Sequence, residues 1–310
     1  MAADFSDIPD VVIDYVRRVF AGANDKVSAA IATHPAMHEE MLDSALVTEL
    51  TAAPPAFFAR EQIAVAIESH WLGGRRMFGR WEIADIAFFI SLRHHGHLTT
   101  RKVALLQTKR LYSNEISTAE LDESDYVIGI GRLVDQTDPT VPLSRQRAFS
   151  FDSSSVYGAL RAGDEQIKRI DEYTSLHDIP VYYGLYNPCS LPFQTLYPPL
   201  DGKVDVGENK VGCRIIPAPN VHKSLSGFAN GRAPSVSDII KHVPKGISSG
   251  NPDYGWRLET FIADEVLRCR QGRRFDGTSD INLQTLLYRR TAPIMAAIAI
   301  TVDFGGDAKG

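Results

Sequence analysis

Apolar residues recur at helical spacing in the first 50 residues of the chain. Residues 10–20 and 38–50 each place apolar side chains three or four positions apart, which predicts two amphipathic helices. A third such run follows the Pro54–Pro55 pair and includes Phe58, Ile63, Ile67 and Trp71. Because proline is well tolerated in the first turn of a helix, we expect a third helix from this pair to Gly73.

The next apolar runs are typical of strands. Residues 81–92 and 102–112 are apolar on both faces of the pleat, as in a central strand that helices cover on each side. Residues 125–134 alternate more weakly and form a third candidate strand. A long helix is predicted from an N-cap at Asp152–Ser153 to His177, and it leads into a strand over residues 179–188.

The pattern changes after residue 187. Residues 187–255 contain nine of the 17 prolines, with many Gly, Asn and Ser residues, and are expected to form ordered loops. A helix is predicted over residues 256–270, and an apolar strand or helix over 294–302. The sequence therefore predicts an α/β layer architecture with an N-terminal helical segment (1–50), a core (51–190) and a loop-rich C-terminal extension packed on that core (191–310).

Composition and charge exclude several classes of protein. The chain has 310 residues, 44% hydrophobic and 23% charged, which argues against a disordered or fibrous protein. Its three cysteines are far apart, which argues against a disulfide framework or a structural zinc site. No apolar run approaches the roughly 18 residues of a membrane span, and the first residues lack signal-peptide features. We therefore expect a cytoplasmic protein without a membrane partner.

Polar side chains interrupt the two central strands. Asp85 shares a strand face with four apolar residues, and Gln107 and Lys109 share a face of the next strand with three. An unpaired charge at such a position costs several kcal/mol, on the order of the burial penalty of an isolated ion. We therefore expect the two strands to compensate each other's charges or to hold a cation together.

A second acid, Glu68, borders the apolar stripe of the helix expected after Pro55, so we expect it to face the sheet. Carboxylate, amide and backbone carbonyl oxygens suit Mg²⁺ or Mn²⁺. A lysine beside them can hold an attacking water or stabilise negative charge on a phosphate. These residues predict a metal-assisted phosphodiester hydrolase. The basic residues expected to contact nucleic-acid phosphates are Arg75, Arg76, Arg80, Arg101 and Lys102.

A helix acid, a strand Asp and a strand Gln-x-Lys, followed by a long helix and a strand, resemble the PD-(D/E)xK nuclease superfamily. The segment LLQTKRLY is similar to the QxK variant found in Mrr-like restriction endonucleases, and the resemblance covers about residues 40–190. It implies a restriction-endonuclease-like mixed central sheet flanked by helices. It also implies metal binding by Asp85 and Gln107, assistance to the nucleophile by Lys109, and Glu68 as the helix acid. The chain departs from the motif in having Gln107 instead of an acid and no proline before Asp85.

The function expected from this resemblance is metal-dependent endonucleolytic hydrolysis of DNA, in prokaryotic defence against foreign DNA. Because the net charge is −5, we expect contact with DNA to come from a local patch, a weak interaction or a partner. A homodimer or a partner protein would supply recognition. Two alternatives stay open. One is a catalytically silent subunit that binds nucleic acid or takes part in an assembly. The other is a ribonuclease, because the metal site would contact only the phosphate group, which DNA and RNA share.

Overall fold

The chain is a mixed α/β protein built on one large sheet. The computed structural model describes residues 4–72, 82–114, 147–197, 211–243, 254–275 and 294–305. The strand order is β1 (Ala56–Phe58), β2 (Ile63–Trp71), β11 (Ile294–Phe304), β3 (Ala84–His94), β4 (His97–Arg110), β6 (Val181–Tyr186), β8 (Arg214–Pro217) and β9 (Trp256–Arg257), and β10 (Arg273–Phe275) pairs with β4. β5 (Arg147–Phe151) and β7 (Phe193–Tyr197) form a separate two-stranded sheet.

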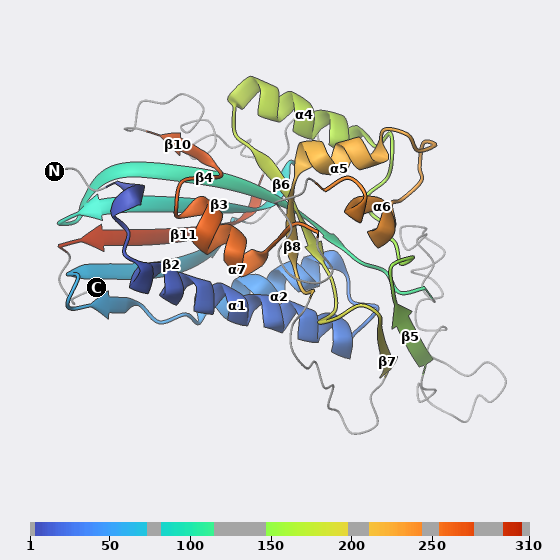
Figure 1. Ribbon diagram of the computed structural model, residues 1–310, viewed down its shortest axis with the longest axis horizontal. Coiled ribbons are helices and arrows are strands. Elements are labelled where there is room, and N and C mark those ends of the chain that lie inside the picture. The colour runs from blue at the N-terminus through green and yellow to red at the C-terminus, as the bar shows by residue number, and fades with distance from the viewer. Residues whose placement is uncertain are drawn as a thin grey trace.

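Helices flank the central sheet on both sides (Figure 1). On one side lie α1 (Asp10–Thr33) and α2 (Glu39–Thr51). Phe20 of α1 packs edge to face against Phe88 of β3, with 5.9 Å between the ring centroids. On the other side lie α4 (Glu165–His177) and α5 (Ala218–Leu225). The other helical segments in the described residues are η1 (Phe5–Asp7), α6 (Val236–Ile240), α7 (Leu258–Thr260) and the π-helix η3 (Phe261–Val266). No helix in the described part of the chain is long and apolar enough to cross a bilayer.

Two connections bring the polar residues of the central strands to one end of the sheet. β3 and β4 form an antiparallel hairpin whose turn, His95–Gly96, has positive φ at both residues. The chain then returns through α4 to β6, which runs parallel to β4 with Gln107 opposite Tyr183. The first residues of β3 and the last residues of β4 and β6 therefore lie together. The strands expected near residues 81–92, 102–112 and 179–188 are confirmed within the described residues.

The helix expected after Pro55 is wrong. The segment forms β1 and β2, and Ile63, Val65 and Ile67 are buried at every second position. Ile63 and Ile67, which suggested helical spacing, also satisfy this two-residue period. The strand is favoured because β11 pairs with β2 along its whole length, from Phe304 opposite Ile63 to Ala296 opposite Trp71.

Two other expected helices are shorter than predicted. The helix expected from residue 152 begins only at Glu165, because Gly163 has a φ of +78° and the Asp164 side chain caps the backbone N–H of Gln166. The helix expected over residues 256–270 is a short strand, one turn of α-helix and the π-helix. The candidate strand at 125–134 lies outside the described residues.

β11 comes from the segment expected to be a loop-rich extension, yet it lies in the middle of the sheet. It is parallel to β3 and antiparallel to β2. Its inward side chains, including Ile298 and Ile300, belong to the same cluster of buried residues as Phe20 of α1 and Leu106 of β4. The division of the chain at residues 50 and 190 stays a prediction.

Candidate active site at the end of β3 and β4

Asp85 is the centre of a buried group of polar side chains. It lies one residue before Ile86, which pairs with Leu106, so Asp85 stands opposite Gln107 where the two strands end. Its Oδ2 accepts three hydrogen bonds: from Gln107 Nε2 at 2.6 Å, from the Thr108 backbone N–H at 2.6 Å and from Thr108 Oγ1 at 2.9 Å. Only 5% of Asp85 is exposed. The structure thus brings Asp85 and Gln107 together, as the alternation of the strands predicts.

Lys109 is also buried, and its partner is an acid that the sequence argument did not select. Its Nζ donates to Glu39 Oε1 at 3.0 Å, and the backbone N–H of Arg110 donates to Glu39 Oε2 at 3.1 Å. Glu39 is the first residue of α2, where a carboxylate is favoured by the dipole of the helix. The helix acid beside Lys109 is therefore Glu39.

The prediction that Glu68 is this helix acid is wrong. Glu68 lies on β2, is exposed, and pairs across the sheet with Ala299 of β11. Since β11 separates β2 from β3, Glu68 lies two strands away from Asp85. The sequence contains a signal for Glu39: residues 38–50 have a helical period, and α2 begins with two acids.

Asp43 is a third acid at the site, one helical turn after Glu39. Its Oδ2 lies 3.0 Å from Thr108 Oγ1, and its Oδ1 accepts a hydrogen bond from Tyr186 Oη at 2.6 Å. The Thr108 hydroxyl therefore lies between Asp43 and Asp85. A hydroxyl has one proton to donate, so it serves only one carboxylate, and the second contact requires a proton on the other acid.

The pKa values of these groups agree with that geometry. Burial raises the pKa of Asp43 well above its usual range, and the charge of Asp85 adds to the shift. Burial also raises the pKa of Asp85 and of Glu39, although Lys109 opposes both shifts. Burial acts to lower the pKa of Lys109, but Glu39 and Asp85 more than offset it, so its pKa is raised. Lys109 is thus an ammonium group, and it is surrounded by the carboxyl groups of Glu39, Asp85 and Asp43.

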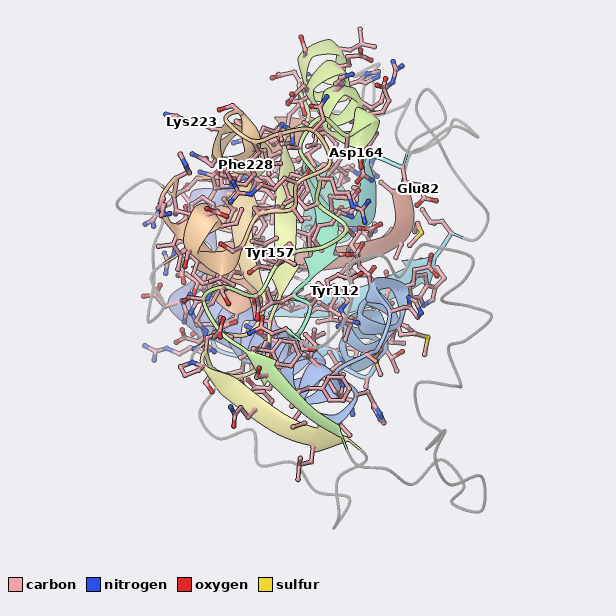
Figure 2. The ribbon with its side chains drawn as sticks, turned by 90° about the vertical axis from the view of Figure 1, so that its right-hand side faces the viewer. Glu82, Tyr112, Tyr157, Asp164, Lys223 and Phe228 are labelled. Carbon is pink, nitrogen blue, oxygen red and sulfur yellow. The ribbon has the colours of Figure 1, made fainter. Side chains whose placement is uncertain are left out.

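Gln166, at the start of α4, fixes the orientation of Gln107. Its Nε2 donates to Gln107 Oε1 at 3.2 Å and to the backbone carbonyl of Glu82 at 3.1 Å. Figure 2 views this end of the molecule and shows Glu82 near Asp164, the residue that caps α4. With Oε1 held by Gln166, the Gln107 amide directs its NH₂ group toward Asp85.

The donor atoms at the site fit a hard divalent cation. The Asp85 carboxylate and the Gln107 amide contain oxygen atoms of the kind that a hard divalent cation binds, although the Gln107 amide turns its NH₂ group toward Asp85. No three His, Cys, Asp or Glu side chains in the described ranges are arranged as a metal-binding group. A cation such as Mg²⁺ usually keeps several waters, so it would need few protein ligands here.

The basic residues expected to contact phosphate are not gathered at this site. Lys102 is 1% exposed and donates from Nζ to the Val266 carbonyl at 3.0 Å, so its prediction as a phosphate contact is wrong. Arg101 is half-buried on β4, six residues before Gln107, which is roughly 20 Å along a strand. The predictions for Arg75, Arg76 and Arg80 lie outside the described residues.

The arrangement places an ammonium group among carboxyl and amide groups. Asp85 and Gln107 are positioned by the ends of two paired strands, and Lys109 by the Glu39 carboxylate at the start of α2. These are the groups that stabilise negative charge on a reacting phosphate. Comparisons of the chain with protein-family models, curated proteins and solved structures find no match.

Proposed function

We propose that this protein is a metal-dependent nuclease of the PD-(D/E)xK type with a restriction-endonuclease-like core. One observation carries the proposal: Asp85, Gln107 and Lys109 converge from two neighbouring strands, with an acid from a preceding helix bonded to the lysine. That acid is Glu39 and takes the place first given to Glu68. The order helix, strand Asp, strand Gln-x-Lys, helix, strand is also the order on which the resemblance rests.

Each residue has a distinct part in the proposed reaction. Asp85 and Gln107 would hold Mg²⁺ or Mn²⁺, which when bound supplies Lewis-acid stabilisation of the phosphate oxygens. Lys109, kept as an ammonium group by the acids around it, orients the attacking water and stabilises developing negative charge rather than removing a proton. Glu39 fixes the position of Lys109, and Thr108 fixes that of Asp85.

The proposed substrate is DNA, and the proposed biological role is defence against foreign DNA. A chain with a net charge of −5 and several acids at its site repels a polyanion, so a bound divalent cation is needed for close approach. Recognition would come from a homodimer, which could cut both strands, or from a partner protein.

The test is a cleavage assay on plasmid DNA, linear DNA and a structured RNA, with Mg²⁺, Mn²⁺ or EDTA. We expect cation-dependent cutting that Asp85→Ala abolishes and that Lys109→Ala or Glu39→Gln reduces roughly 100-fold or more, in the range seen when one group that stabilises the transition state is removed. Glu68→Gln is the matched control, because Glu68 is exposed two strands away, and it should cut like the wild type.

Cutting that survives Asp85→Ala and Lys109→Ala would contradict the proposal, as would loss of activity in Glu68→Gln alone. Preference for the RNA substrate would make the protein a ribonuclease that uses the same site.

One observation favours the second candidate, a catalytically silent subunit that binds nucleic acid or assembles with a partner. The Gln107 amide presents its NH₂ group, not its oxygen, to Asp85, and an NH₂ group does not bind a cation. Under this candidate the wild type binds nucleic acid but cuts none of the three substrates with either cation.

A further inference from the structure

The amide groups of Gln107 and Gln166 form a chain of hydrogen bonds with a definite direction. Gln166 Nε2 donates to the Glu82 carbonyl at 3.1 Å and to Gln107 Oε1 at 3.2 Å, and Gln107 Nε2 donates to Asp85 Oδ2 at 2.6 Å. The backbone carbonyl of Glu82 accepts only. It therefore sets the orientation of Gln166, which in turn sets that of Gln107.

A cation shared by Asp85 and Gln107 requires the opposite orientation of Gln107, because only Oε1 is a ligand. Turning Gln107 alone would set its NH₂ group against the NH₂ group of Gln166. Turning both amides would restore that bond but would set Gln166 Oε1 against the Glu82 carbonyl. In either case at least one hydrogen bond is lost when the cation binds through Gln107.

We propose that Gln166 is a positioning residue that holds Gln107 in a cation-free orientation and so raises the cation concentration at which the site fills. This inference rests on the proposed function, since it concerns the same site. It assigns the protein a built-in threshold for Mg²⁺ or Mn²⁺, set by a side chain on α4 that does not bind the cation.

The test measures Mn²⁺ binding directly, from the spectroscopic signal of free Mn²⁺ in titrations of the whole protein. Gln166→Met removes both donated hydrogen bonds at similar side-chain volume and leaves the backbone cap by Asp164 in place. We expect Mn²⁺ to bind roughly fivefold more tightly to this variant, the factor that corresponds to one hydrogen bond of ordinary strength. Gln194→Met, at an exposed position on β7, is the matched control and should bind like the wild type.

The same substitution is then made in a Gln107→Glu protein. A carboxylate presents an oxygen to the cation in either orientation, so Gln166→Met should no longer tighten binding there. In that protein the substitution instead removes a bond that holds the carboxylate ligand in place, and binding should weaken. A residue with only a structural role would not reverse the sign of its effect in this way.

Equal or weaker Mn²⁺ binding by Gln166→Met in the Gln107 background would overturn the inference and leave the proposed function standing. Gln166→Glu gives an independent reading if the methionine variant does not fold. Its carboxylate accepts from the turned Gln107 amide, so it should also bind Mn²⁺ more tightly. Failure of the wild type to bind Mn²⁺, or equal binding by wild type and Asp85→Asn, would overturn the metal site itself.

Discussion

At the scale of single residues, the contacts of Asp43 determine a pH dependence. Its carboxyl group lies against Thr108 Oγ1, which also bonds Asp85, and its pKa in the folded protein is raised well above the ordinary value of 3.8. The folded state therefore favours the protonated acid. The stabilisation is complete below the ordinary pKa, and it is lost as pH rises through the folded-state pKa.

The variant that tests this is Asp43→Asn, whose amide mimics the protonated acid and does not ionise. The free energy of unfolding of the wild type should fall relative to the variant as pH rises from about 4, by at most about 1.4 kcal/mol per pH unit. Urea unfolding of both proteins at pH 5, 7 and 9 measures the difference. Parallel pH profiles would show that Asp43 is ionised in the folded protein.

The residues on the central strands could be predicted from sequence, but the helix residues Asp43 and Gln166 that contact them could not. Asp85, Gln107 and Lys109 interrupt apolar strands, so the high cost of burying charge marks them. Asp43 and Gln166 sit on amphipathic helices, where polar residues are ordinary. Only the packing of α2 and α4 on opposite faces of the sheet brings these side chains to the site.

At the scale of elements, the placement of β11 carries the clearest prediction. Ile298 is fully buried in the middle of the sheet, where β11 lies between β2 and β3. Ile298→Ala should lower the free energy of unfolding by about 2–5 kcal/mol, the range for truncation of a buried aliphatic side chain. The half-buried Thr301, on the opposite face of the same strand, is the control, and Thr301→Ala should cost less than about 1 kcal/mol.

Chemical denaturation measures both variants. If Ile298→Ala and Thr301→Ala lowered the free energy of unfolding by similar small amounts, β11 would be an extension packed on the sheet and not an integral strand of it.

The elements show why local pattern was an incomplete guide. The β3–β4 hairpin and β6 were predicted because their apolar runs are long and bounded by turn residues. The β2 segment was predicted as a helix because Ile63 and Ile67 fit both a helical and an alternating period. What decides between the two periods is pairing with a strand more than 200 residues later, which no local window contains.

At the scale of the whole molecule, buried polar bonds join distant parts of the chain. Asn24 of α1 donates from Nδ2 to Glu259 Oε2 at 2.8 Å and accepts the backbone N–H of Cys213 at 2.7 Å. Most of the buried hydrophobic residues in the described ranges belong to one cluster, which extends from Phe5 to Val302. We therefore expect one cooperative thermal transition, with equal calorimetric and van't Hoff enthalpies of unfolding. Two resolved transitions in calorimetry would instead divide the chain into independent domains.

The central position of β11 also has a consequence for synthesis of the protein on the ribosome. β2 and β3 leave the ribosome early, but the strand that belongs between them is about 200 residues further along the chain. At roughly 5–20 residues per second, the interval is on the order of 10–40 s. During that time the nascent chain carries two apolar strands whose edges lack their native partner. Such edges are sites of aggregation, so the nascent chain is exposed to intermolecular strand pairing until β11 arrives.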